Sequence, residues 1–140
     1  MDRSSRRGSA LLELAVAIPV LLLFTMAVVD YARVYYASIA VASAAMAGAQ
    51  YGAPYDSSDS ITVGAQRDAG SVTLDSVTTV RFCRCPDNVF ANCVGDTCGT
   101  YGEVQQYDSV RVRKDVPLLM RYIGLPSQIT IVKTAVLRSQ

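Results

Sequence analysis

The sequence contains no histidine. This absence excludes Ser-His and Cys-His nucleophilic catalysis, histidine general-base chemistry and zinc sites built from mixed Cys and His ligands. The formal net charge is only +1, and no segment after the first eight residues carries a dominant basic patch. A nucleic-acid partner is therefore not expected. With histidine chemistry excluded, we expect a protein that is not an enzyme and that needs no cofactor or metal.

Hydrophobic residues are concentrated in the first 50 positions, where Ala10–Val29 forms an apolar run with Glu13 as its single charge. Twenty such residues, at about 1.5 Å each, cross the roughly 30 Å hydrocarbon layer of a bilayer. Pro19 lies inside the run and can kink a helix, which a membrane segment tolerates. Basic residues are in excess before the run and not after it, so the positive-inside rule predicts a cytoplasmic N-terminus. The basic residues are Arg3, Arg6 and Arg7.

A cleaved secretory signal peptide is the main alternative for this start. Signal peptides have an apolar region of about 7–15 residues, then small residues at a cleavage site and a break. Here the run is longer, holds Glu13 and continues without a turn signal into residues 30–52. The pattern therefore favours a single membrane-spanning helix.

Residues 30–52 predict that the helix continues beyond the bilayer. Apolar side chains recur there at helical spacing and predict one buried face, made of Tyr31, Tyr35, Ala42, Met46 and Ala49 with Ile39 beside them. From Ser9 to Tyr51 the helix would hold 43 residues and measure about 65 Å. Its many alanines allow close packing, either between neighbouring subunits or against the chain's own soluble part.

The remaining residues predict a small domain and an α+β fold. Residues 60–70 predict a short helix capped by Asp59 or Ser60. Three segments are predicted strands of an antiparallel sheet that packs on the long helix. They are Thr78–Arg84, Tyr107–Val116 and Gln128–Arg138, and we expect three to four strands in all. In the second of these, Val110 and Val112 should point inward and Arg111 and Arg113 outward. Residues 117–126 form an apolar connection, for which a small core is favoured over a docking patch.

Four cysteines lie close together in this domain, at Cys83, Cys85, Cys93 and Cys98. Cys83 and Cys85 would share one face of a strand, too far apart to bond. The open pairings are Cys83–Cys93 with Cys85–Cys98, or Cys83–Cys98 with Cys85–Cys93. Zinc binding by four cysteines is the alternative, but an oxidising compartment favours two disulfides. Acidic and amide side chains in the same loop show no EF-hand spacing and fit turn chemistry, namely Asp87, Asn88, Asn92 and Asp96.

The N-terminal segment RRGSALLELAVAIPVLLLFTMAVVDYARVYYASIAVASAAMAGA resembles the TadE-like pseudopilins of tight-adherence (Tad) pilus systems. These type IV prepilin-like proteins have a basic leader ending in glycine and a glutamate at the fifth mature position. The resemblance places the leader at residues 1–8, the cut between Gly8 and Ser9, and the fifth-position glutamate at Glu13. Leu14 departs from the aromatic residue that is more usual there. The C-terminal segment VRVRKDVPLLMRYIGLPSQITIVKTAVLRS is also similar to the family's tail.

The resemblance implies that Glu13 of one subunit meets the new α-amino group at Ser9 of another, because pairing offsets the cost of a carboxylate in hydrocarbon. It further implies a minor pilin-like subunit that supports assembly or initiation of a Tad/Flp-type pilus for surface adhesion. The implied partners are a prepilin peptidase, the major Flp-type pilin, other minor pilin-like subunits, the inner-membrane assembly platform and the lipid bilayer.

The expected organisation is a leader at 1–8, a transmembrane helix at 9–29, its extramembrane continuation at 30–52 and a periplasmic domain at 53–140. The expected location is the bacterial inner membrane, crossed once, with the option of incorporation into the pilus. The alternative function is an uncleaved single-pass protein that presents a periplasmic binding or adaptor domain.

Overall fold

The computed structural model describes residues 3–52, 58–99 and 102–139, with side chains from Ala10 onward. A long helix is followed by a short helix and an antiparallel sheet whose strand order is β2-β1-β3-β4. This architecture confirms the predicted α+β class. The elements are α1 (Arg3–Gly52), α2 (Ser58–Asp68), β1 (Ser76–Arg84), β2 (Phe90–Ala91), β3 (Gln105–Pro117) and β4 (Gln128–Arg138).

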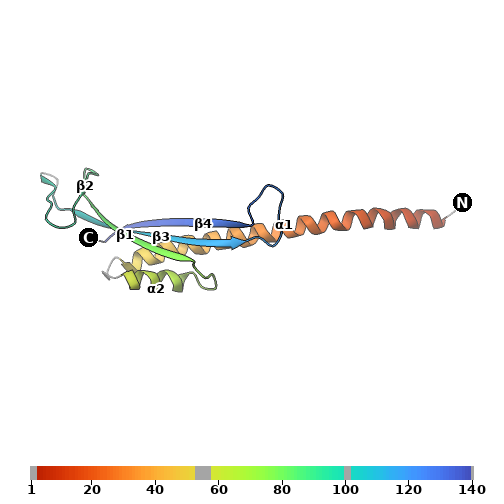
Figure 1. The fold of residues 1–140 in the computed structure, drawn as a ribbon, viewed down its shortest axis with the longest axis horizontal. Helices are drawn as coiled ribbons and strands as arrows, with labels where there is room; N and C mark the ends of the chain where they lie inside the picture. The colour runs from red at the N-terminus through yellow and green to blue at the C-terminus, as the bar shows by residue number, and fades with distance from the viewer. Residues whose placement is uncertain (1–2, 53–57, 100–101, 140) are drawn as a thin grey trace.

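Helix α1 is continuous through Pro19 and begins at Arg3, six residues before the predicted start at Ser9. Between Ala10 and Val29 every side chain is exposed except Ala27, which is half-buried. This half of α1 extends well beyond the sheet (Figure 1). It is long and apolar enough to span a membrane. Its most apolar 18-residue stretch has a mean hydropathy of 2.5, and no residue of that stretch is buried. The chain therefore has one candidate membrane span at its N-terminal end among the described residues.

The second half of α1 lies along the sheet and supplies one side of the core (Figure 1). Its buried stripe repeats every four residues, at Ala37, Val41, Ala45 and Ala49. The sheet meets this stripe with residues that alternate along β3 and β4, namely Val110, Val112, Val116, Ile131 and Ala135. Small side chains on the helix let the sheet approach closely, as alanine-rich faces do in packed helices.

The predicted buried face of α1 was wrong except at Ala49. Tyr31, Tyr35, Ile39 and Met46 are between 48% and 72% exposed, and Ala42 is also exposed. The core instead takes the neighbouring alanine and valine stripe, because larger side chains would hold the sheet away from the helix. The alanines thus pack on the chain's own domain, which was one of the two options left open.

Helix α2 packs against the C-terminal end of α1 through small residues. A Cβ atom added at Gly64 would lie 2.7 Å from the Tyr51 ring, and one at Gly48 would lie 3.2 Å from the Ala65 Cβ atom. Ala44, Ala65 and Ala69 fill the rest of this contact. The helix begins at Ser58, so Asp59 and Ser60 lie in its first turn rather than at the predicted cap.

The sheet contains the three predicted strands and one short addition. Strand β4 has the predicted bounds, whereas β1 and β3 are longer than predicted by one to two residues at one or both ends. The short β2 pairs with the end of β1, with Cys83 opposite Ala91. In β3, Val110 and Val112 are fully buried while Arg111 and Arg113 are exposed, which confirms the predicted alternation.

The connection between β3 and β4 is not the small core that was favoured. Leu119 and Leu125 are 57% and 59% exposed, and Ile123 is completely exposed at 106%. The loop closes on itself, because the Leu118 N–H donates to the Ser127 carbonyl at 3.1 Å. Leu118 and Tyr122 are half-buried and line a pocket against α1, so the loop packs in part on the helix and leaves its other apolar side chains largely exposed.

Candidate functional site

An exposed stripe runs along almost the whole length of α1. Beginning at Glu13, side chains three or four residues apart occupy one face of the helix and are all exposed. They continue from the apolar half into the half that lies on the sheet, on a face that the sheet leaves open. The stripe consists of Glu13, Ala17, Leu21, Phe24, Val28, Tyr31, Tyr35, Ile39, Ala42 and Met46.

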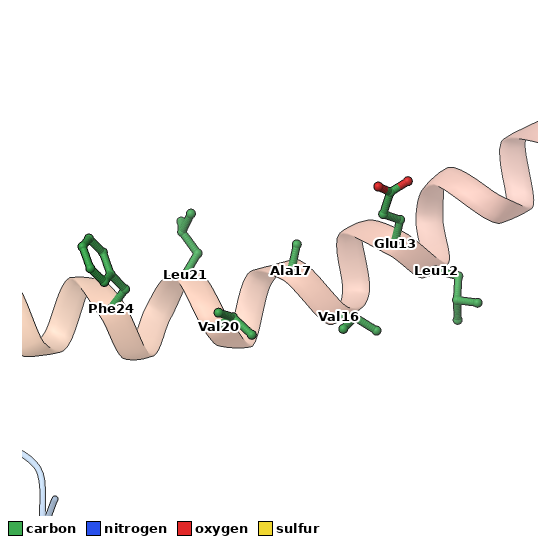
Figure 2. A pocket seen from close by; sticks show the side chains of 7 residues that line it. All are labelled: Leu12, Glu13, Val16, Ala17, Val20, Leu21 and Phe24. Atoms are coloured by element: carbon green, nitrogen blue, oxygen red, sulfur yellow. The ribbon is translucent and has the colours of Figure 1, made fainter.

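Figure 2 shows the start of this stripe. Glu13, Ala17 and Leu21 extend from the same side of α1, with Phe24 further along, whereas Leu12, Val16 and Val20 point to the other side. A shallow notch lies along these two rows and is lined by side chains of both. The notch is almost entirely apolar apart from the Glu13 carboxylate, so a second helix lying along the stripe would find one charged group in an apolar groove.

Gly8 and Ser9, the predicted processing residues, lie in the first turns of α1. They precede Glu13 by five and four residues on the same helix. An α-amino group at Ser9 would therefore lie about one helical turn from the carboxylate of its own chain.

A second polar site lies where the exposed and packed halves of α1 meet. Asp30 is only 3% exposed. Its carboxylate accepts hydrogen bonds from the Leu119 N–H at 2.9 Å and from the Tyr122 hydroxyl at 3.1 Å. The Arg33 guanidinium lies 3.4 Å from the same carboxylate and also donates to the Pro117 carbonyl at 3.4 Å. Asp30 thus fastens the β3–β4 loop to the helix.

These contacts set the ionisation of both acidic groups at the site. The Leu119 N–H, helped by the Tyr122 hydroxyl and opposed by desolvation, holds the pKa of Asp30 below its ordinary value of 3.8. Desolvation and the hydrogen bond to Asp30 raise the pKa of Tyr122 above 10.0. The carboxylate is therefore charged and the phenol neutral over the whole physiological range, which is the pairing that the hydrogen bond requires.

The sequence did not single out Asp30 as a site. Its signal was present, since an acidic residue directly after an apolar run needs a partner if it is to be buried. The donors, however, come from a loop 89 and 92 residues away. No pattern in the sequence connects that loop to the helix.

The cysteines form two disulfides, Cys83–Cys93 and Cys85–Cys98. This is the first of the two pairings that the spacing left open. The bridges hold a loop at the end of the domain opposite to the N-terminus of α1 (Figure 1). Cys83 and Cys98 are buried, whereas Phe90 and Val94 are 67% and 89% exposed.

Turn chemistry and one cation–π contact complete this loop. Asp87 accepts the Val89 N–H at 3.2 Å, and Asp96 accepts the Asn92 N–H at 2.7 Å, which confirms the interpretation as turns. The Arg84 guanidinium lies 4.2 Å from the centroid of the Phe90 ring. No group of three or more potential metal-binding side chains occurs in the part of the chain that the structure describes.

The predicted site residues therefore belong to separate places. Glu13 lies on the exposed half of α1, and the cysteines lie at the far end of the domain, with Asp30 between them. The molecule does not gather these residues into one pocket, and the arrangement favours contacts along a surface over chemistry at a centre.

These features define an α+β protein with one N-terminal candidate span among the described residues. The helix that carries this span also forms one layer of the folded domain. The comparison with protein families finds one family that is similar to the N-terminal part of the chain. The family described as TadE-like protein matches residues 8–50, which confirms the resemblance over α1. No curated protein and no solved structure gives a significant match.

Proposed function

We propose that this chain is a minor pilin-like subunit that supports assembly or initiation of a Tad/Flp-type pilus used for surface adhesion. The observation that carries the proposal is the continuous exposed stripe on α1, which begins at Glu13 and ends at Met46. A surface helix of a monomeric domain normally turns its apolar face inward. Here one apolar stripe faces the sheet, and a second faces outward along the same helix. The outward stripe suits packing against the helices of other subunits.

The carboxylate of Glu13 needs a cationic partner when the helices pack together. A carboxylate facing lipid is costly, and a cationic partner at the same depth offsets the cost. After cleavage between Gly8 and Ser9, the α-amino group of Ser9 supplies such a cation near neutral pH. A neighbouring helix shifted along the stripe brings its amine to Glu13. The ion pair favours the assembled state over the isolated subunit.

The proposed partners follow from this arrangement. A prepilin peptidase removes residues 1–8 on the cytoplasmic side. The major Flp-type pilin, other minor pilin-like subunits and the inner-membrane platform meet the stripe, and the bilayer surrounds residues 10–29 before assembly. The subunit acts through these contacts and performs no chemistry of its own.

A second candidate function is an uncleaved, membrane-anchored protein with a periplasmic binding or adaptor domain. The observation that favours it is the disulfide-bonded loop, which exposes Phe90 and Val94 at the end of the domain far from the candidate span. The two candidates differ in whether the chain is cleaved at Gly8.

Gel mobility and N-terminal sequencing test the cleavage step. Co-expression with a prepilin peptidase should shorten the chain and leave Ser9 as its first residue, and Gly8→Ala should stop this. A chain that keeps its leader in every case, while still inserting in the membrane, would contradict the pilin-like function and favour the adaptor.

Glu13→Gln tests the assembly contact separately from cleavage. The variant should be cleaved, but it should lose most co-purification with other pilus subunits, because a neutral amide cannot form the ion pair. Leu12→Gln is the matched control, since it adds the same amide one residue away and off the stripe. Equal co-purification of the two variants would argue against a specific role for Glu13.

A further inference from the structure

The β3–β4 loop, residues 118–127, exposes apolar side chains that the assembly proposal does not explain. Leu119, Ile123 and Leu125 are all more than half exposed, and Ile123 contacts almost nothing in the described molecule. Leu125 also lines a pocket between the loop and α1. Gly124 has a φ of +85°, which allows the tight turn beside Ile123. Exposed apolar side chains on a loop that is closed by its own hydrogen bonds indicate that the loop contacts something outside the domain.

The position of the loop along α1 indicates what that partner is. Its fastening point, Asp30, directly follows the run that ends at Val29. Since residues 10–29 match the roughly 30 Å hydrocarbon layer, Asp30 lies at the boundary between hydrocarbon and headgroups. The loop is therefore held beside the helix at the level of the membrane surface. In Figure 1 it projects sideways from α1 at the end of the sheet nearer to the N-terminal half of the helix.

The side chains around the loop are also of the kinds that are found at the membrane surface. Tyr31, Tyr35 and Tyr36 are 58% to 72% exposed and follow immediately after the run. Tyrosines gather at the headgroup layer because their rings are apolar and their hydroxyls are polar. Arg121 in the loop is exposed, and residues 118–127 contain no acidic residue. An exposed arginine in a segment with no acidic residue of its own suits the anionic headgroups of a bilayer.

We propose that residues 118–127 dock into the headgroup region of the bilayer that α1 spans, with Leu119, Ile123 and Leu125 at the acyl boundary. The occupant of this surface is thus lipid. This inference rests on the membrane insertion of residues 10–29, which belongs to the proposed function. Asp30 is the positioning residue, because its buried carboxylate holds the loop at the right height without itself meeting lipid.

Docking would give the domain a second point of attachment to the membrane. A single helix leaves the attached domain free to tilt and to rotate about the helix axis. A loop that enters the same leaflet beside the helix restricts both motions. The sheet then stands at a fixed height. Its disulfide-bonded end, which lies opposite to the N-terminus of α1 in Figure 1, is directed away from the bilayer.

The chain contains no tryptophan, so a single introduced tryptophan reports its own surroundings by fluorescence. Three variants of the full chain are compared in phosphatidylcholine and phosphatidylglycerol vesicles. Ile123→Trp probes the loop, Phe24→Trp probes the span, and Val94→Trp probes the disulfide-bonded loop; all three positions are highly exposed. A part of the phosphatidylcholine carries bromine near the headgroup end of its acyl chains, where it quenches nearby indole rings.

Ile123→Trp should lose most of its emission in brominated vesicles and shift to shorter wavelength, while Val94→Trp should change in neither respect. Phe24→Trp should be quenched as well, which establishes that the span is inserted. If Phe24→Trp is quenched and Ile123→Trp behaves like Val94→Trp, the docking proposal is overturned and the anchor stands. If Phe24→Trp is not quenched, the insertion underlying both proposals is wrong.

Discussion

Asp30 decides how the two halves of the molecule meet. A carboxylate at 3% exposure needs donors, and it takes them from the backbone of Leu119 and the hydroxyl of Tyr122. A buried carboxylate that lost these donors would leave an uncompensated charge. One acidic side chain therefore connects the end of the apolar run to a loop formed near the end of the chain. Glu13 differs from it, since its partner lies in another molecule under the proposed function.

The lowered pKa of Asp30 predicts loss of stability in acid. A carboxyl whose pKa is lower in the folded than in the unfolded chain stabilises the fold fully above the unfolded value and loses that effect as pH falls through the folded one. The free energy of unfolding of the detergent-solubilised chain should therefore fall as pH drops below 3.8. Asp30→Asn should be less stable at neutral pH and should show a smaller change in acid. Urea unfolding at a series of pH values measures both.

Asp115→Asn is a second variant for this experiment, at another carboxyl group whose pKa is lowered. The Thr130 hydroxyl and Arg113 hold the pKa of Asp115 below 3.8 as well, but Asp115 lies in β3 and does not contact the loop. Each single variant should remove part of the acid dependence, and the double variant more than either. An Asp30→Asn variant with the full acid dependence of the wild type would show that the Asp30 contact does not contribute.

At the scale of elements, close approach between α1 and its neighbours depends on small side chains. The sheet rests on an alanine and valine stripe, and α2 rests on glycines and alanines. At the far end of the domain, two disulfides lie beside a cluster in which the Phe82 ring contacts the rings of Phe90 and Tyr107. Bridges that join residues 10 and 13 positions apart remove freedom from the unfolded chain, worth about 3 kcal/mol each in the loop-entropy account.

Gly64→Ala tests the α1–α2 contact. The added methyl group would lie under 3.0 Å from the Cβ and Cγ atoms of Tyr51, so the helices must separate or the tyrosine must move. Overpacking of this kind costs about 1–3 kcal/mol, against roughly 1 kcal/mol gained because alanine favours the helix. We expect a net loss of about 1 kcal/mol in denaturant unfolding. Val63→Ala, at the half-exposed neighbouring position, should change stability far less, and a stabilised Gly64→Ala would contradict the tight contact.

The whole molecule is one long helix with a domain built on half of it (Figure 1). Because α1 is continuous from Arg3 to Gly52, its exposed half and the half that packs on the sheet belong to one helix. The candidate span, the Asp30 contact and the disulfide-bonded loop follow one another along the molecule. This order suits a subunit that joins a membrane or a helical bundle at one end and presents a stapled surface at the other.

The proposed orientation predicts the redox state of the cysteines in cells. If the domain lies in the periplasm, all four cysteines are oxidised and resist alkylation by a maleimide until they are reduced. Val94→Cys should add one thiol that a membrane-impermeant maleimide labels from the periplasm, since Val94 is 89% exposed. A gel-shift assay with polyethylene glycol-maleimide reads both results. Free thiols in the unreduced wild type, or labelling only after lysis, would place the domain on the cytoplasmic side.

The sequence alone determined the elements and their types, because these depend on local and periodic properties. The 20-residue apolar run, the alternation of Val110 and Val112 with arginines, and the alanine-rich continuation were sufficient to predict a long helix and an antiparallel sheet. The Gly8–Glu13 spacing and the neighbouring pattern indicated the TadE-like family, which matches residues 8–50.

Only the tertiary structure decided which face of α1 is buried, how the cysteines pair and where residues 118–127 lie. Two apolar stripes on one helix satisfy the same periodicity, so the choice between them depended on how closely the sheet could approach Ala37, Val41 and Ala45. The loop and Asp30 are 89 residues apart, and their contact exists only because β3 returns along α1. Periodicity describes one element at a time, whereas these contacts are settled by shape between elements.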